Sequence, residues 1–116
     1  MDYSINKIEL RGRVGGTTIR KAGDTRCARV SLITDYYYKG RDGAAVVDST
    51  WHNLLVWEGK NVPKLEDIVS GSIFHVLGRI RTDKYTSSEG EEKYSTEIIV
   101  ARGAIEEDDL TPKNYL

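Results

Sequence analysis

The stretch that decides the fold of this chain is Thr50-Trp51-His52-Asn53-Leu54-Leu55-Val56-Trp57. In a β-strand, successive side chains alternate between the two faces of the sheet. One face of this strand then carries Trp51, Asn53, Leu55 and Trp57, and the other carries His52, Leu54 and Val56. The second face suits a core, so the pattern predicts a strand with one large indole near each end of its outer face.

The two indoles define a candidate binding surface. Trp51 and Trp57 would lie about 20 Å apart, at about 3.3 Å per residue of strand. Flat aromatic faces at this separation suit a long ligand that is itself made of flat rings, and single-stranded nucleic acid is such a ligand. From the residues alone, the alternative is that both tryptophans are ordinary core or interface aromatics.

Length and composition indicate one domain that needs no disulfide bond to be stable. A chain of 116 residues fits a single domain and can bury a core, and its one cysteine excludes an intramolecular disulfide. No apolar run approaches a membrane span, and the first residues lack the pattern of a secretory signal. We therefore expect a cytoplasmic protein that does not interact with membranes.

The residues of catalytic and metal sites are scarce. Two histidines and one cysteine have no metal-ligand spacing, and Gly15-Gly16 is not followed by the Lys-Ser/Thr of a phosphate-binding loop. No nucleophile with its base, and no pair of tuned carboxylates, stands out. The sequence predicts no enzyme activity, no catalytic residue, no metal and no cofactor.

Charge is unevenly distributed along the chain. The formal net charge is −1, which alone argues against a nucleic-acid binder. However, residues 1–82 hold 13 Lys and Arg against 9 Asp and Glu, whereas residues 83–116 hold 4 against 9. A mildly basic body thus precedes an acidic end, and a solvated surface is the alternative explanation of this asymmetry.

Most of the chain has the pattern of β-strands. The expected strands span residues 5–14, 27–38, 50–57, 72–85 and 93–105, with Gly15-Gly16 ending the first of them. Residues 61–69 are the one helix candidate, with Asn61 as N-cap and Pro63 in the first turn. Five strands with a helix between the third and fourth predict an all-β, five-stranded OB-fold barrel. Residues 1–106 would form this domain, and residues 107–116 a short, acidic, flexible tail.

Four segments resemble the bacterial single-stranded DNA-binding protein (SSB) family. They are Ile5-Asn6-Lys7-Ile8-Glu9-Leu10-Arg11-Gly12; Thr50-Trp51-His52 with the apolar residues and Gly59-Lys60 that follow; Gly78-Arg79-Ile80-Arg81-Thr82-Asp83-Lys84-Tyr85; and Tyr94-Ser95-Thr96-Glu97-Ile98-Ile99-Val100. They occur in the order and spacing of that family. The resemblance covers about residues 5–105, and it implies binding of single-stranded DNA without sequence preference in replication, recombination or repair.

The resemblance also implies which residues contact DNA. Bases would stack on Trp51, Trp57, Tyr85, Tyr38 and Tyr36. Lys84 and Lys60 match basic positions of the family, and from the residues themselves we expect Arg79, Arg81, Arg13, Arg11 and Lys7 to bind phosphates with them. For the tyrosine run, packing against a neighbouring subunit is the alternative.

The partners implied are single-stranded DNA and the chain itself, as a homotetramer or a dimer. Relatives carry a long tail with an acidic tip that recruits proteins; Glu106-Glu107-Asp108-Asp109 does not resemble that tip, so such recruitment is not implied. The acidic residues of the segment 89–92 should repel phosphate, and Asn53 stands where relatives often have arginine. The alternatives are a replication accessory protein of similar fold, an OB-fold module for RNA or oligosaccharide, and an assembly protein with buried aromatics.

Overall fold

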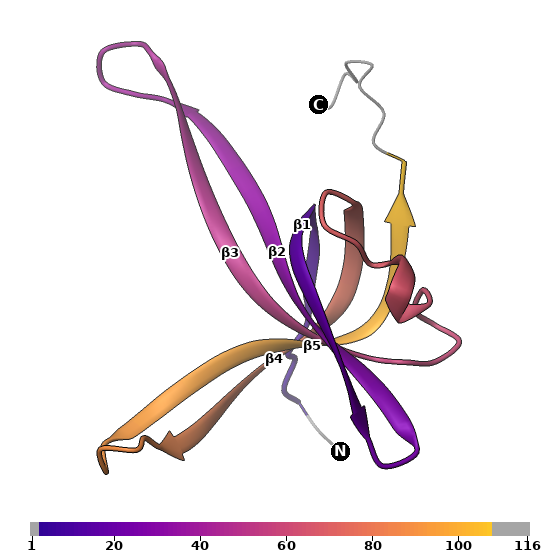
Figure 1. The fold of residues 1–116 in the computed structure, drawn as a ribbon. Coiled ribbons are helices and arrows are strands. Elements are labelled where there is room, and N and C mark those ends of the chain that lie inside the picture. Colours follow the sequence, from indigo (N-terminus) through magenta and orange to yellow (C-terminus); the bar gives the residue numbers. More distant parts are fainter. Residues whose placement is uncertain (1–2, 108–116) are drawn as a thin grey trace.

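The computed structural model describes residues 3–107, which form a closed five-stranded barrel with the strand order β1-β2-β3-β5-β4 (Figure 1). The strands are β1 (Ile8–Ala22), β2 (Thr25–Lys39), β3 (Ala45–Trp57), β4 (Ile73–Thr86) and β5 (Glu92–Glu106). All neighbours are antiparallel except β3 and β5, which run parallel. This confirms the predicted all-β barrel. The expected tail lies outside the described residues from position 108 onward.

The expected helix at residues 61–69 is wrong in length and type. The structure has a single 3-10 turn, Leu65–Asp67, between β3 and β4. Val62 precedes a proline, which disfavours helical backbone there, and the carbonyl of Asn61 accepts a hydrogen bond from the Gly103 N–H of β5. Asn61 therefore joins the barrel and does not cap a helix.

The 3-10 turn closes one end of the core. Leu65 and Ile68 are each 1% exposed, and their spacing of three residues matches the period of a 3-10 turn. Val69, which a longer helix would have buried with them, is 53% exposed.

Four of the five strands are longer than the sequence pattern predicts, and β4 has the expected length, shifted by one residue. Gly15-Gly16 does not end the first strand: β1 continues to Ala22 through an irregularity in register between Val14 and Gly16. Such a β-bulge bends a strand without ending it. Gly12 and Gly78 allow close approach, because a Cβ on either would lie 2.2 Å from a carbonyl oxygen, that of Ile33 or of Ile99.

The core fills the inside of the barrel. Alternate residues of β2 and β3 enter it, including Val30 and Leu32 from β2 and Leu54 and Val56 from β3. Phe74 of β4 is completely buried. Residues between these positions point outward, and this alternation determines which side chains are available to a ligand.

Candidate nucleic-acid interface

Two long hairpins extend from the barrel. The β2–β3 pairing runs out to Lys39 opposite Ala45, and the β4–β5 pairing to Thr86 opposite Glu92. Figure 1 shows both hairpins leaving the same side of the barrel and diverging. The two strands that carry half of the predicted DNA contacts, β3 and β4, each belong to one of them.

Five predicted contacts on β3 and β4 share the outward-facing side of the barrel strands, here called the outer face; Arg11 and Arg13 of β1 also have this phase, opposite to that of Leu10 and Val14. On β3, Trp51 and Trp57 alternate with the buried Leu54 and Val56 and are 63% and 43% exposed. On β4, the outer positions belong to Arg79, Arg81 and Tyr85, out of phase with Phe74 and Val76. Leu55 has the same phase as the tryptophans, yet it is buried where it pairs with Ile99 of β5.

The Trp51 ring lies over the backbone of β1. A Cβ on Gly15 would come within 2.7 Å of the Cζ3 atom of that indole, at the point where β1 bulges. Any larger residue at this position would have to displace the ring. Because Gly15 has no side chain, the indole can pack directly on the β1 backbone, a contact here called the seat of Trp51, while most of the Trp51 side chain stays exposed.

Arg81 takes part in an ion cluster on the outer face. Its Nη2 donates to Glu97 Oε1 at 2.7 Å, and its Nε lies 3.3 Å from Asp83 Oδ2. Arg29 of β2, which the sequence patterns did not single out, donates from Nη1 to the other carboxylate oxygen of Glu97 at 2.8 Å. Arg29 and Glu97 are 68 residues apart, so only the closed barrel brings them together.

Tyr36, Tyr38 and Lys84 lie on the opposite face of their hairpins from Trp51. The register pairs Tyr36 with Asp48 and Tyr38 with Val46, in phase with the buried Leu54. The two tyrosine rings are neighbours, with centroids 6.2 Å apart. Lys84 has the phase of Phe74, and its Nζ lies 2.9 Å from Glu92 Oε1. The structure therefore does not bring these three residues onto the outer face.

The remaining predicted phosphate contacts lie along β1 and in the loop after β3. Lys7 and Arg79 line one small groove of about 280 Å³. Arg13 donates from Nη1 to the Gly71 carbonyl at 2.7 Å, and Arg11 Nη1 lies 3.7 Å from Glu106 Oε1. Lys60 is exposed just after β3.

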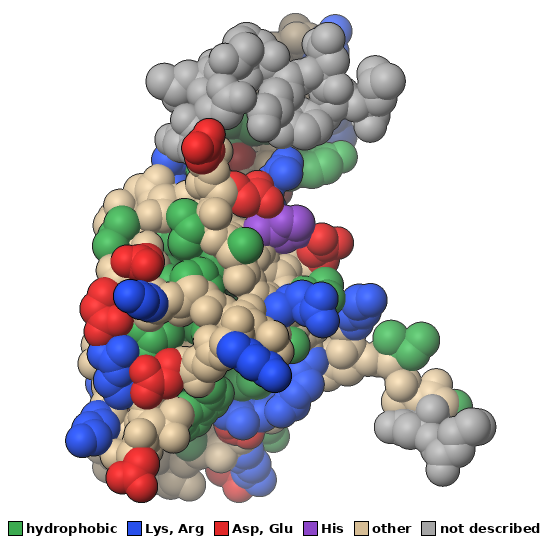
Figure 2. Space-filling model, turned by 90° about the vertical axis from the view of Figure 1, so that its right-hand side faces the viewer, with side chains coloured by type: hydrophobic (Ala, Val, Ile, Leu, Met, Phe, Trp, Pro, Cys, Tyr) green, Lys and Arg blue, Asp and Glu red, His purple; other side chains and the backbone are tan. Residues whose placement is uncertain are grey.

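The side of the barrel that faces away from the two hairpins presents both charges. Figure 2 shows basic and acidic side chains together on this side, which carries the 3-10 turn. The formal net charge of −1 therefore hides many charges of both signs, and on this side of the barrel they lie close together (Figure 2).

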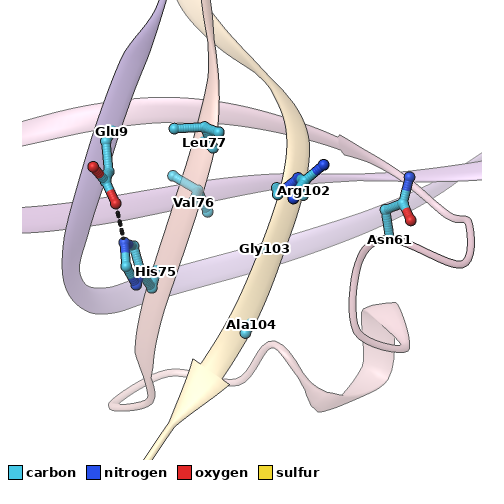
Figure 3. A pocket seen from close by; sticks show the side chains of 8 residues that line it. All are labelled: Glu9, Asn61, His75, Val76, Leu77, Arg102, Gly103 and Ala104. Carbon is cyan, nitrogen blue, oxygen red and sulfur yellow. Dashed lines mark hydrogen bonds and ion pairs between the residues drawn. The ribbon is translucent and has the colours of Figure 1, made fainter.

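A histidine between two carboxylates occupies a separate pocket, of about 400 Å³. Nε2 of His75 lies 2.7 Å from Glu9 Oε2, as Figure 3 shows, and Nδ1 lies 2.9 Å from Glu106 Oε2. The hydrogen bonds to Glu9 and Glu106 raise the pKa of His75. His52, in contrast, is bonded to Thr34, and burial lowers its pKa.

The His75 cluster predicts a pH dependence of stability. Because the pKa of His75 is raised on folding, its contribution is full below its ordinary value and is lost as pH rises through the folded-state value. Urea unfolding of the wild type should show this loss above about pH 6.5, and His75→Gln should remove it. His52→Gln is the control and should keep it; an unchanged pH profile in His75→Gln would contradict the assignment.

Within residues 3–107, no three His, Cys, Asp or Glu side chains are grouped so that they could hold a metal ion. Over the same range, no helix is long and apolar enough to cross a bilayer.

Comparison of the sequence with known proteins identifies the family to which this chain belongs. Residues 5–105 match the model of the Single-strand binding protein family. A single-stranded DNA-binding protein of Xanthomonas axonopodis pv. citri is 37% identical over 102 residues, covering 85% of this chain and 56% of that protein. One of Rickettsia felis is 32% identical over 104 residues, covering 86% of this chain and 68% of that protein.

Solved structures show the same fold. A Plasmodium falciparum SSB in complex with ssDNA has a TM-score of 0.73 at 27% identity, covering 90% of this chain and 96% of that one. A mutant single-stranded DNA-binding protein of Thermus aquaticus has a TM-score of 0.72 at 15% identity, covering 90% and 51%, and supports the fold alone. The chain spans 56–62% of the length of its relatives from Xanthomonas and Xylella.

Proposed function

Because the chain belongs to the single-strand binding protein family, we propose that it binds single-stranded DNA without sequence preference. Residues 1–106 act as the binding domain, protecting unpaired strands in replication, recombination or repair. Proteins of this family are DNA-binding proteins and not enzymes, which confirms that no catalytic activity is to be expected. The observation that carries the proposal is the pair of exposed indoles on β3, on the same face as the arginines of β4.

Stacking supplies the first part of the affinity. A base that stacks on an aromatic face contributes about 1–3 kcal/mol, and every base has such a face, so binding tolerates any sequence. Trp51, Trp57 and Tyr85 are 63%, 43% and 48% exposed, so their rings are open to bases along the outer face. Tyr36 and Tyr38 offer further rings on the other face of the β2–β3 hairpin, for a strand that passes around it.

Phosphate contacts supply the second part. Lysine and arginine displace counterions from the strand, which makes the affinity fall as salt rises. Arg79, Arg81, Arg11 and Arg13 are available for this on the outer face, and Lys7 lies beside Arg79. Lys60 follows β3, and Lys84 is on the opposite face of the β4–β5 hairpin. The exposed Glu89, Glu91 and Glu92 at the β4–β5 hairpin tip repel the strand and direct it toward the barrel.

Quenching of indole fluorescence tests the proposal. Titration with oligo-dT should quench Trp51 and Trp57, more weakly at higher salt, whereas duplex DNA of equal length should quench far less. Equal quenching by duplex would contradict single-strand binding, and unquenched indoles would favour an assembly role. A poly-U titration in parallel measures the preference for DNA over RNA.

The seat of Trp51 gives a second test. Gly15→Ala should push the indole off β1, because the new Cβ would sit 2.7 Å from the ring. We expect weaker quenching by oligo-dT and an affinity lower by up to about tenfold, part of the stacking contribution of one base. Gly16→Ala is a matched control, since a Cβ there meets nothing within 4 Å. Equal titration curves for the two variants would exclude an effect of the seat.

We also propose that the protein works in the cytoplasm as a homo-oligomer, a tetramer or a dimer. Tyr3 and Ile5, at 94% and 89% exposed, lead into the β1 segment that pairs with β4, and exposed apolar groups beside a strand suit contact between copies. Light scattering with and without a long oligonucleotide measures the assembly state. A monomer under both conditions would contradict this proposal.

A further inference from the structure

A polar groove crosses the outer face of β1, β2, β3 and β5. Its volume is about 410 Å³. The side chains that give it hydrogen-bonding character are Thr18, Arg29, Ser31, Asn53, Ser95 and Glu97. Asn53 is two residues from Trp51 on the same face, a step of about 6–7 Å along a strand. The groove therefore lies directly beside an indole on which a base can stack.

Glu97 is the buried anchor of this groove. It is 6% exposed, and each of its carboxylate oxygens accepts a hydrogen bond from a different arginine, at 2.8 Å from Arg29 and 2.7 Å from Arg81. A buried carboxylate is tolerated only when such partners neutralise it. Glu97 thereby holds both guanidinium groups in fixed positions on the outer face.

The two arginines are not equivalent. Arg81 directs Nη2 to Glu97 and places Nε beside Asp83, so two carboxylates match its charge. Arg29 has one ion-pair contact among residues 3–107, through Nη1, and its side chain is 57% exposed. A guanidinium has five N–H donors in a rigid fork. Arg29 can therefore keep its bond to Glu97 while other donors bind a ligand in the groove.

We propose that this groove binds one phosphodiester group of a single strand, with Arg29 as its ligand and Glu97 as the positioning residue for Arg29. The hydroxyl and amide groups of Ser31, Asn53 and Ser95 then bond the adjoining sugar or base edge. This inference rests on the proposed single-strand binding. The charges of Arg29, Arg81, Glu97 and Asp83 cancel, so the groove acts through N–H donors of fixed direction, which suit a phosphate better than a diffuse positive surface does.

Arg29→Gln in the full chain tests the phosphate ligand by titration with oligo-dT. We expect about tenfold weaker binding, as for loss of one charge-assisted hydrogen bond, and a slope of log affinity against log salt reduced by about 0.7. Arg20→Gln is the matched control: it removes the same charge from an exposed position on β1 outside the groove. If the wild type binds and the two variants behave alike, the groove assignment is overturned while the proposed function stands. A wild type that does not bind removes both.

Glu97→Gln tests the positioning role. If Glu97 merely repelled phosphate, its neutralisation would tighten binding. A positioning role predicts the opposite. Binding should become about fivefold weaker although one negative charge is removed, because Arg29 loses the charge-assisted hydrogen bond that holds it in place. Added to Arg29→Gln, the Glu97→Gln change should weaken binding less than it does in the wild type, because only Arg81 then remains for Glu97 to position. Tighter binding by Glu97→Gln overturns the role.

If Glu97→Gln does not fold, Arg29→Lys still tests whether the guanidinium group of Arg29 bridges Glu97 and a phosphate. An ammonium group has the same charge but cannot span a carboxylate and a phosphate as a fork does. We expect binding several-fold weaker than wild type with an unchanged salt slope, and circular dichroism like that of the wild type. Wild-type affinity in Arg29→Lys would overturn the assignment.

Discussion

Trp51→Ala is expected to weaken binding of oligo-dT by about 1–3 kcal/mol, or about 5- to 150-fold in Kd. The indole is 63% exposed and contributes nothing to the central core, so its loss removes a stacking face while the barrel stays intact. Fluorescence anisotropy with a labelled oligo-dT measures the change, and circular dichroism and the unfolding midpoint check the fold.

Two variants make the Trp51 experiment specific. Val69→Ala shortens an apolar side chain that is 53% exposed between the 3-10 turn and β4, and it should leave affinity unchanged. Trp51→Phe keeps a flat face and should recover part of the affinity. Unaltered binding by a folded Trp51→Ala protein would remove this residue from the interface.

Phe74→Ala is expected to lower the free energy of unfolding by about 3–5 kcal/mol. The ring is fully buried, and it lies so close to β5 that a Cβ on Gly103 would come within 2.7 Å of it. Removing it leaves a cavity that the closed sheet cannot fill by collapse. For a domain of this size, such a loss is a large fraction of the total stability.

Urea denaturation followed by circular dichroism measures the effect of Phe74→Ala. Ile80→Ala is the control on the same strand and the same face: Ile80 pairs with Ile98 at the edge of the core and is 43% exposed, so we expect a loss of about 1 kcal/mol or less. If both variants lost equal stability, the core would not be centred on Phe74.

The strand pattern was readable from sequence because alternation is local. The phases of Trp51 and Trp57 on β3, and of Arg79 and Arg81 on β4, follow from period two and hold in the structure. The β-bulge at Gly15 was not readable, since two adjacent glycines are equally typical of a chain that turns away. A helical turn within residues 61–69 was readable, but its short span was not, because Asn61 bonds β5, a contact between distant segments.

The candidate site was readable only in part, for the same reason. Exposed aromatics and basic residues could be listed from motifs, but a motif does not say which of them share a face; alternation along each strand does, and it separates Lys84 from Tyr85. Lys84 and Tyr38 fall on the opposite face from Trp51. The sequence did not single out Arg29 as a ligand-binding residue, because its partner Glu97 belongs to the last strand, 68 residues away.

The parallel junction between β3 and β5 is the narrowest seam of the barrel. Among the described residues, the two strands pair only where Leu54 meets Ile98 and Leu55 meets Ile99, whereas every other junction extends over a longer run. The two hairpins diverge from this point (Figure 1). Backbone amides here should exchange with solvent sooner than those of the β2–β3 ladder. We therefore expect bending at this seam to strain fewer backbone hydrogen bonds than bending at any other junction, so the spacing of the two arms is the dimension of the barrel that changes at the lowest cost.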